Sequence, residues 1–305
     1  MPLGIDPTVD YAFKKLFAVP ENSDLLIHLL NAVIQPESPI VVVELLNPFN
    51  EKKFSEDKLS VLDIKARDSA GKWYNVEMQT RAVHVLRQRL PYYNSLLFAD
   101  QLSEGDGYEL LAAAITVCFL NDVLFPGVES PHLSFTLCDC ARKVQLSDCL
   151  QIHTIELPKY NFKEDSLGKA DPLVKWAFFL SHAAELEVSD LKRLLPEKAF
   201  IKATGVMEMI GATPQQRAFY ESRRKAELDY KSFVAAARQE ERQIALREGR
   251  QEGREEGLKE GLIGQVRLLQ DLLHEPVTSE ADLMGLESEA LTQLCSQLKK
   301  RLLPE

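Results

Sequence analysis

The stretch from Leu59 to Gln79 constrains the fold of this chain more than any other, because it has the pattern of a β-hairpin. In each half of the stretch apolar side chains alternate with polar ones, as they do in a strand with one buried face. The segment from Asp68 to Gly71 connects the two halves. A three-residue loop with Gly71 in the left-handed region would pair Asp68 with Lys72 and so fix the register of the hairpin.

This register would place two carboxylates side by side. Asp63 in the first strand would lie opposite Glu77 in the second, and Gln79 would follow two residues later on the same face. A loop one residue longer or shorter would move the two acids to opposite faces. Adjacent carboxylates repel each other unless a cation or a proton lies between them, and such a pair suits Mg²⁺. The alternative is a solvent-exposed face on which Lys65 and Lys72 neutralise the acids.

The sequence resembles a known family at several points that occur in the expected order. An Asp followed at a distance by Glu-x-Gln is a variant of the Asp…(Glu/Asp)-x-Lys motif of the PD-(D/E)XK nuclease superfamily. The segments that carry the resemblance are Asp10–Phe17, Leu62–Asp68, Asn75–Gln79, Arg89–Tyr93, Gly107–Tyr108 and the Glu-Gly repeats near residue 250. The whole chain is similar to the recombination-promoting nuclease, or putative transposase, family of bacteria.

The resemblance implies a metal-dependent DNA endonuclease that acts in recombination, mobile-element movement or defence. It implies that Asp63 and Glu77 are catalytic and hold Mg²⁺, for which Mn²⁺ can substitute, and that Asp10 is a further ligand of the metal or of its water. Gln79 is the third catalytic candidate and stands where the superfamily usually has Lys. A lysine brings a positive charge to the attacking water, whereas a glutamine offers only a neutral donor and acceptor. Without that charge the metal must contribute more to catalysis, or the rate of cleavage is lower.

Three more residues are candidates for contacts with DNA. The resemblance makes Lys14 a phosphate contact, although Lys14 follows Asp10 by one helical turn and the alternative is a surface i,i+4 ion pair. Arg89 and Tyr93 are also one turn apart and face the same way, so that together they could hold a phosphate. The alternative is an arginine stacked on a tyrosine. Pro91 between them should kink the helix or mark its start.

The hydrophobic pattern of the rest of the chain predicts an α/β fold, with a mixed β-sheet in a PD-(D/E)XK-like nuclease core, flanking helices and a helical C-terminal region. Buried strands are expected at 40–46, 112–120, 132–137 and 151–157. Helices are expected at 8–34 with a break near Pro20, at 82–102 and within 171–235. Glu44 lies in the first of these strands and needs a partner there. It is either a paired acid of the core or another ligand near the metal, and we favour the pair.

A four-residue glycine period marks the C-terminal part of the chain, at Gly249, Gly253, Gly257 and Gly261. Each glycine costs a helix close to 1 kcal/mol, but this period keeps all four on one stripe that another helix could approach closely. The alternative is a flexible charged linker, and the dense i,i+4 Glu/Arg pairs favour the helix. We therefore expect a homodimer or higher homo-oligomer that forms through the C-terminal helices.

These patterns predict four segments. They are a nuclease domain at 1–165, a helical extension at 166–237, a glycine-striped helix at 238–270 and a small C-terminal helical segment at 271–305. Within the last segment, residues 279–303 are expected to form one helix.

The formal charge of -10 is unusual for a nucleic-acid binder. It argues against tight non-specific DNA binding and leaves an alternative open, a weakly active or inactive relative that works as an oligomeric interaction or regulatory protein. The start of the chain has no secretory signal pattern, and the longest apolar run, Leu110–Leu120, is too short to span a bilayer. A cytoplasmic protein that does not enter a membrane is therefore expected.

Overall fold

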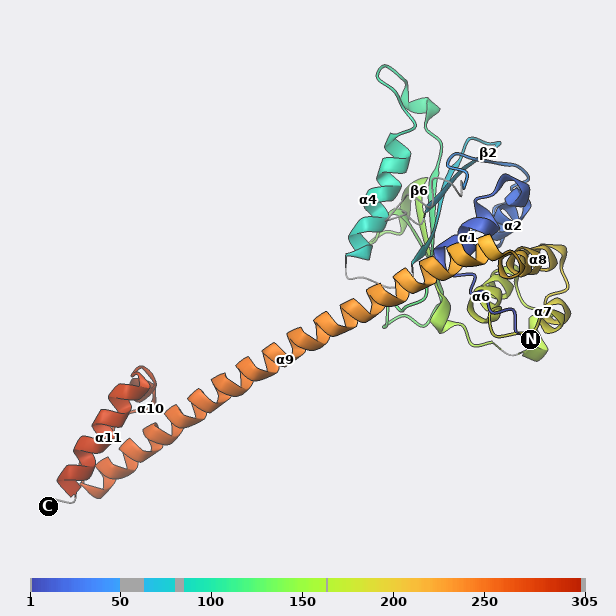
Figure 1. The fold of residues 1–305 in the computed structure, drawn as a ribbon. Helices are drawn as coiled ribbons and strands as arrows, with labels where there is room; N and C mark the ends of the chain where they lie inside the picture. Colours follow the sequence, from blue (N-terminus) through green and yellow to red (C-terminus); the bar gives the residue numbers. More distant parts are fainter. Residues whose placement is uncertain (1, 50–62, 80–84, 163, 303–305) are drawn as a thin grey trace. The chain divides into compact units, whose positions relative to one another are not determined.

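The computed structural model describes residues 2–49, 63–79, 85–162 and 164–302. The chain divides into two compact units, Met1–Ala226 and Glu227–Glu305. The helix α9 (Pro214–Leu272) begins in the first unit and ends in the second (Figure 1). The four segments expected from the sequence remain a prediction.

The first unit is built on a mixed β-sheet, which confirms the predicted α/β fold. In the described part of the chain the sheet has six strands in the order β1-β2-β3-β4-β6-β5. They are β1 (Val43–Leu45), β2 (Asp63–Asp68), β3 (Trp73–Gln79), β4 (Ala114–Leu120), β5 (His132–Asp139) and β6 (Val144–Glu156). The pairs β3–β4 and β4–β6 are parallel and the others are antiparallel. The carboxyl ends of β3, β4 and β6 therefore meet at one edge of the sheet.

Helices cover both faces of this sheet. The helices of the first unit, besides the start of α9, are α1 (Asp10–Phe17), α2 (Ser23–Ile34), α4 (Leu86–Ala99), α5 (Glu164–Leu167), α6 (Pro172–His182), α7 (Val188–Leu194) and α8 (Lys198–Ala212). Within the described residues of this unit three short 3₁₀ turns accompany them, η1 (Pro20–Asn22), η2 (Tyr108–Leu110) and η3 (Leu157–Lys159). The main core packs one face of the sheet against α1, α2, α6 and α8, and α4 covers the other face (Figure 1).

The side chains of β3 alternate between the two faces of the sheet. Val76 and Met78 join the main core, whereas Asn75 and Glu77 are directed to the face that α4 covers. The neighbouring β4 is buried along its whole length, because it is a central strand with a parallel neighbour on each side. The polar residues of β3 therefore lie in a mostly apolar layer.

Two predicted strands are less buried than their sequences suggest. In the run 40–46 only Val43–Leu45 forms a strand, and Val41 and Val42 are 71% and 57% exposed. The expected strand at 132–137 exists as β5, but most of it is exposed. Both interpretations of burial were wrong for the same reason. β1 and β5 lie at the two edges of the sheet, so that each pairs with one neighbour only.

The second unit contains most of α9 together with α10 (Glu280–Met284) and α11 (Ser288–Leu302). The prediction of one helix at 279–303 was wrong. Ser279 caps α10, whose last turn closes with the amide of Gly285 bonded to the carbonyl of Ala281 at 3.3 Å. Leu291 and other apolar residues of α11 pack on the end of α9.

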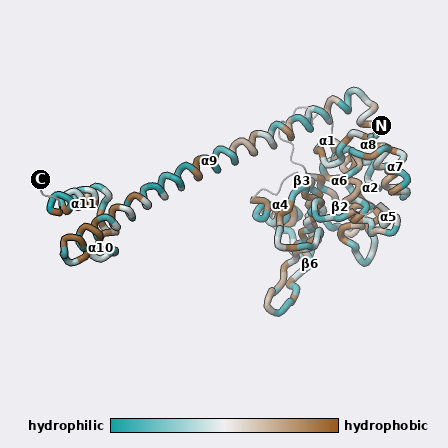
Figure 2. Tube along the Cα trace, turned by 90° about the horizontal axis from the view of Figure 1, so that it is seen from below, coloured by the Kyte–Doolittle hydropathy of each residue, from teal (hydrophilic) through white to brown (hydrophobic). Residues whose placement is uncertain are grey.

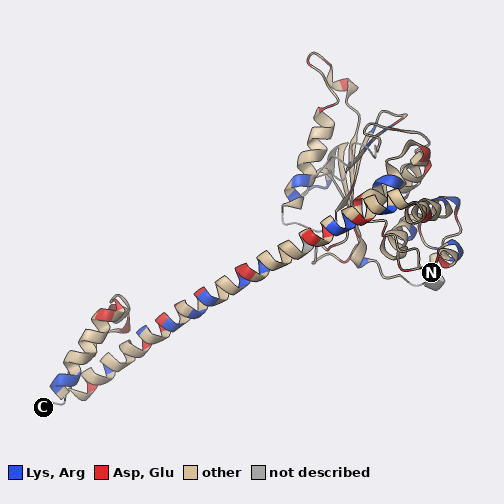
Figure 3. Ribbon diagram, viewed as in Figure 1, with Lys and Arg blue, Asp and Glu red and all other residues tan. Residues whose placement is uncertain are grey.

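The glycine period lies within α9, which confirms a helix and rules out a linker. A Cβ atom built on Gly249, Gly253, Gly257 or Gly261 would meet no atom within 4 Å. This part of α9 is hydrophilic (Figure 2), with basic and acidic residues distributed along it (Figure 3). Among the described helices, none is both long enough and apolar enough to cross a bilayer.

Candidate active site

The β2–β3 hairpin has the register that the sequence predicts. Asp63 is the Cα partner of Glu77. The connection closes with the amide of Asp68 bonded to the carbonyl of Lys72 at 3.0 Å. Gly71 has φ +84°, in the left-handed region where glycine carries no steric penalty. The turn therefore brings the backbones of the two acids together in neighbouring strands.

The side chain of Asp68 holds this turn, which sequence reasoning did not anticipate. Its Oδ1 accepts hydrogen bonds from the amides of Ala70 and Lys72, each at 2.9 Å, and its Oδ2 accepts one from the hydroxyl of Tyr74 at 2.7 Å. Burial raises the pKa of Tyr74, and the hydrogen bond to Asp68 raises it further, so that this hydroxyl remains a donor. The signal was present in the sequence, because an Asp at the start of a tight turn often accepts from amides that follow.

Two neutral amides orient the carboxylate of Glu77. Its side chain is buried, and Oε1 accepts a hydrogen bond from Nδ2 of Asn75 at 2.6 Å. Oε2 accepts one from Nε2 of Gln79 at 3.1 Å. All three residues lie on one face of β3, because they alternate along the strand. Asn75 is a site residue that sequence reasoning missed, although its spacing of two from Glu77 was the signal.

The strand β4 contributes a buried thiol to the same face. Cys118 is the Cα partner of Glu77 across the parallel pair. Burial raises the pKa of Cys118 well above its usual value, the charge of Glu77 adds to this effect, and Arg89 opposes it. In the metal-free protein a thiol with such a raised pKa stays protonated, so it is a poor nucleophile. Leu86 and Leu90 of α4 pack in one cluster with Cys118, so this helix lies on the same side of the sheet as Glu77.

The helix α4 is anchored over the sheet by a buried amide. Nδ2 of Asn94 donates to Oγ1 of Thr116 at 2.9 Å and to backbone carbonyls of β4 and β6. In the same helix the guanidinium carbon of Arg89 lies 5.7 Å from the ring centroid of Tyr93, which is the stacked arrangement considered above. Pro91 does not mark a helix start, because α4 begins at Leu86. The contact of Arg89 and Tyr93 with DNA remains a prediction.

The start of α1 lies at the carboxyl ends of the parallel strands. The amide of Asn121 donates to the carbonyl of Gln79 at 3.0 Å, and its Nδ2 donates to Oγ1 of Thr8 at 2.9 Å. Two residues later Asp10 pairs with Lys14 at 3.2 Å, with side chains that are 15% and 11% exposed. The i,i+4 ion pair considered as the alternative is therefore present, but it does not lie on an exposed surface, because packing of α1 against the core covers it. The roles of Asp10 as a ligand and of Lys14 as a phosphate contact remain predictions.

The described side chains alone do not complete a metal site. Among them, no three His, Cys, Asp or Glu residues come together as a group that could hold a metal ion. The side chain of Asp63 lies outside the described part of the structure, and only its backbone register is described. Glu44 pairs with Arg67 at 2.8 Å, as we favoured, but the expected place in the core was wrong, because the pair lies on the exposed edge of the sheet. The ligand set of Asp63, Glu77 and Asp10 is therefore a prediction.

A mixed sheet flanked by helices, with an acidic hairpin beside parallel strands, is consistent with a fold of the PD-(D/E)XK class. Comparison with protein families matches residues 7–237 to the PD-(D/E)XK nuclease family transposase. The chain belongs to this family. Neither the comparison with curated proteins nor the comparison with solved structures found a match.

Metal binding at the hairpin predicts a cation-dependent rise in the melting temperature. A ligand that binds only the folded protein stabilises it by mass action, so Mg²⁺ or Mn²⁺ at about a hundred times its Kd should raise the Tm by roughly 5 to 10 °C. In Asp63→Asn and in Glu77→Gln this rise in Tm should shrink to about 1–2 °C or less, because each variant lacks one of the carboxylates that hold the cation. Differential scanning fluorimetry with and without the cation measures it.

Glu44→Gln is the matched control, because it removes an acid from β1 that pairs with Arg67 on the exposed sheet edge. The control should keep the full cation response. An unchanged response in both Asp63→Asn and Glu77→Gln would place the metal elsewhere on the chain.

Proposed function

We propose that this protein is a divalent-metal-dependent DNA endonuclease that hydrolyses phosphodiester bonds. Asp63 and Glu77 would hold Mg²⁺, with Asp10 as a further ligand, and Mn²⁺ would substitute for it. The observation that carries the proposal is the pairing of Asp63 with Glu77 in a chain of this nuclease family. Recombination, mobile-element movement and defence are the settings in which such an activity would operate.

The groups around Glu77 suit a hard cation. Besides its carboxylate oxygens, Oδ1 of Asn75 is buried with no hydrogen-bond partner among the described residues. A buried acceptor without a partner costs roughly 1–3 kcal/mol, and a metal-bound water would relieve that cost. Oxygen donors are the ligands that Mg²⁺ and Mn²⁺ prefer.

Each neighbour of Glu77 has a separable role in this proposal. A bound divalent metal would polarise the scissile phosphate and acidify a water. The amides of Asn75 and Gln79 hold the two oxygens of Glu77 in a fixed orientation. Because Nε2 of Gln79 is engaged with Glu77, its amide oxygen is the group that can accept a hydrogen bond from an attacking water and so orient it.

The candidates for DNA phosphate contact differ in how much charge they can offer. Lys14 is largely buried and its charge is offset by Asp10. Arg89 is half-buried and stacks on Tyr93, a residue that is 40% exposed. A guanidinium on an aromatic face keeps its outer donors available for a phosphate. Arg89 with Tyr93 is therefore the stronger candidate, and Lys14 would act by orienting Asp10.

A second candidate function is an oligomeric interaction or regulatory protein with weak or no activity. The net charge of -10 favours it, because such a chain repels the DNA backbone. Gln79 favours it as well, because the site lacks the positive charge of the usual lysine. The family assignment and the acid pair support the nuclease more strongly.

We also propose that the chain forms a homodimer or a higher homo-oligomer through its C-terminal helices. The four glycines of α9 leave a stripe without side chains, and in the described structure no atom lies against that stripe. A second helix could therefore approach the backbone of α9 closely. Two copies would supply two active sites, as cleavage of both strands of a duplex requires.

The proposed mechanism predicts graded losses of cleavage. Gln79→Ala should reduce the rate of plasmid nicking by about 10- to 100-fold, because it removes one hydrogen bond to Glu77 and one to the water in a site of low dielectric constant. Asp63→Ala should abolish nicking, because the metal is lost. Gln79→Lys should retain part of the activity, since its charge assists phosphate binding. The rate at which supercoiled plasmid is converted to the nicked form in the presence of Mg²⁺ measures the activity of all three variants.

Gln145→Ala is the control, because Gln145 is an exposed glutamine in the strand β6. It should cleave at the wild-type rate. Nicking by Asp63→Ala at near the wild-type rate, with contaminating nucleases excluded, would contradict the assignment of the site. A wild-type protein that never nicks DNA would favour the second function.

The assembly proposal predicts that bulky residues in the glycine stripe weaken the oligomer. Replacing Gly253 and Gly257 by Leu should lower the mass measured by light scattering toward that of a monomer. Leucine favours a helix more than glycine does, so that loss of assembly cannot result from loss of the helix. The matched Gly253→Ala and Gly257→Ala double variant should remain assembled, because alanine still permits close approach. A monomeric wild-type protein at tens of micromolar would contradict the proposal.

A further inference from the structure

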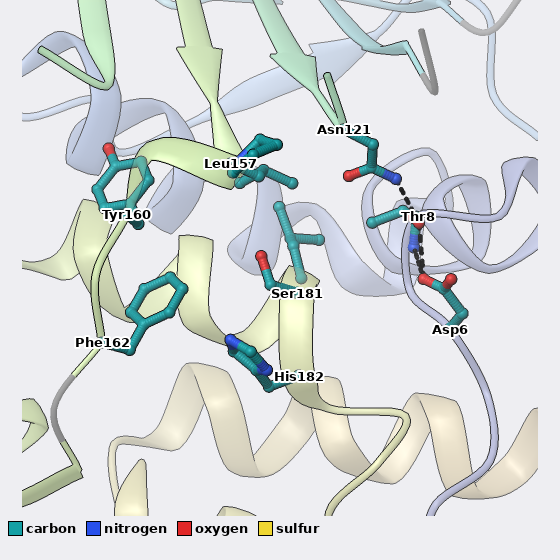
Figure 4. A pocket seen from close by; sticks show the side chains of 10 residues that line it. Asp6, Thr8, Asn121, Leu157, Tyr160, Phe162, Ser181 and His182 are labelled. Carbon is teal, nitrogen blue, oxygen red and sulfur yellow. Dashed lines mark hydrogen bonds between the residues drawn. The ribbon is translucent and has the colours of Figure 1, made fainter. Parts of the chain in front are cut away.

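A cavity of about 380 Å³ lies at the same edge of the sheet as the acidic hairpin. It opens where β4 and β6 end, and it is bounded by the start of the chain and by the last turn of α6 (Figure 4). Ligands of open α/β sheets bind at the carboxyl ends of parallel strands. The position of this cavity makes it a candidate binding site that the catalytic residues do not use.

The polar wall of the cavity presents acceptors. Oδ1 of Asp6 accepts hydrogen bonds from the amide and the hydroxyl of Thr8 at 2.8 and 2.7 Å, and Nδ2 of Asn121 donates to the same hydroxyl (Figure 4). These bonds hold the two side chains in place. Among the described residues, Oδ2 of Asp6 and Oδ1 of Asn121 have no hydrogen-bond partner, so each remains able to accept from a ligand.

The opposite wall is aromatic (Figure 4). The rings of Tyr160 and Phe162 stack with centroids 5.8 Å apart and an angle of 5° between their planes. His182 packs edge-to-face on Phe162 at 5.1 Å. Ser181 lies between the aromatic and the polar wall (Figure 4). Such a pair of walls suits a flat ring system that stacks on one side and donates hydrogen bonds on the other.

The charges of the lining exclude some ligands. The described lining residues include Asp6 and no lysine or arginine. A phosphate or another anion would therefore meet a carboxylate without a compensating cation. A neutral heterocycle with amino groups fits the two open acceptors, and carboxylate and amide side chains recognise the exocyclic amines of cytosine and adenine.

We propose that this cavity binds an unpaired nucleobase of the DNA substrate, with preference for bases that carry an exocyclic amino group. The substrate class rests on the proposed nuclease function. Asn121 connects the two sites, because its backbone amide is bonded to the carbonyl of Gln79. β4 lies next to β3 in the sheet, and neighbouring strands are about 4.8 Å apart. Leu157 and Leu180 of the cavity belong to the main core, whereas Glu77 faces α4, so a base in the cavity would belong to a DNA strand that passes over the ends of these strands. The enzyme would then act on single-stranded or locally opened DNA.

Binding of free deoxynucleosides tests the cavity independently of cleavage. Saturation-transfer NMR on the full chain should give signals for deoxyadenosine, deoxycytidine and deoxyguanosine that exceed those for thymidine. Ser181→Trp would fill the cavity and should reduce these signals by at least about tenfold, the size of one lost base stack. Ser189→Trp is the matched control, because Ser189 is exposed on α7 away from the cavity lining, and it should keep them.

The outcomes separate the cavity from the nuclease proposal. If none of the nucleosides gives a signal at millimolar concentration, or if Ser181→Trp binds them as the wild type does, the inference is overturned even where plasmid is nicked. Equal signals for thymidine and the three amino-bearing nucleosides would overturn the stated preference. Base-selective binding that Ser181→Trp alone removes supports the cavity, and it does so even where nicking is absent and the nuclease proposal fails.

Discussion

The register of the β2–β3 hairpin is the constraint on which the rest of the candidate site depends. Asp68 accepts hydrogen bonds from two amides of its own turn and from Tyr74, and Gly71 supplies the positive φ. A slip of one residue would exchange the faces of the strand. Glu77 would then enter the main apolar core, where an unpaired carboxylate is costly, and it would no longer share a face with its partner acid.

Beyond the hairpin, the carboxyl ends of the parallel strands bring the candidate site residues to one end of the sheet. β3, β4 and β6 end together, so the catalytic candidates, the start of α1 and the cavity beside Asn121 lie at adjacent strand ends. The two faces of the sheet have different contacts. One face binds the main helical layer and provides the hydrophobic stabilisation of the unit, and the other holds Glu77 under α4. The candidate catalytic residues of β3 and its packing residues are therefore separated by the alternation of side chains along this strand.

Local patterns predicted the features that depend on neighbours in the sequence. The hairpin register, the break near Pro20 and the helical state of the glycine period are of this kind. Burial was less predictable, because whether 40–46 or 132–137 lies at an edge depends on the strand order, which is a long-range property. Glu77 and Gln79 were singled out by alternation together with the resemblance to the nuclease family. The neighbouring thiol of Cys118 was not, because the parallel pairing of β3 with β4 joins segments that α4 separates in the sequence.

The central claim is that a divalent metal binds between the acid of β2 and the acid of β3. Diffraction from crystals grown with Mn²⁺, measured at the manganese absorption edge, locates that metal directly. The account predicts an anomalous peak within coordination distance of a carboxylate oxygen of Asp63 and one of Glu77. Mn²⁺ bound only at other positions, with no peak between these two residues at a concentration that saturates the protein, would contradict it.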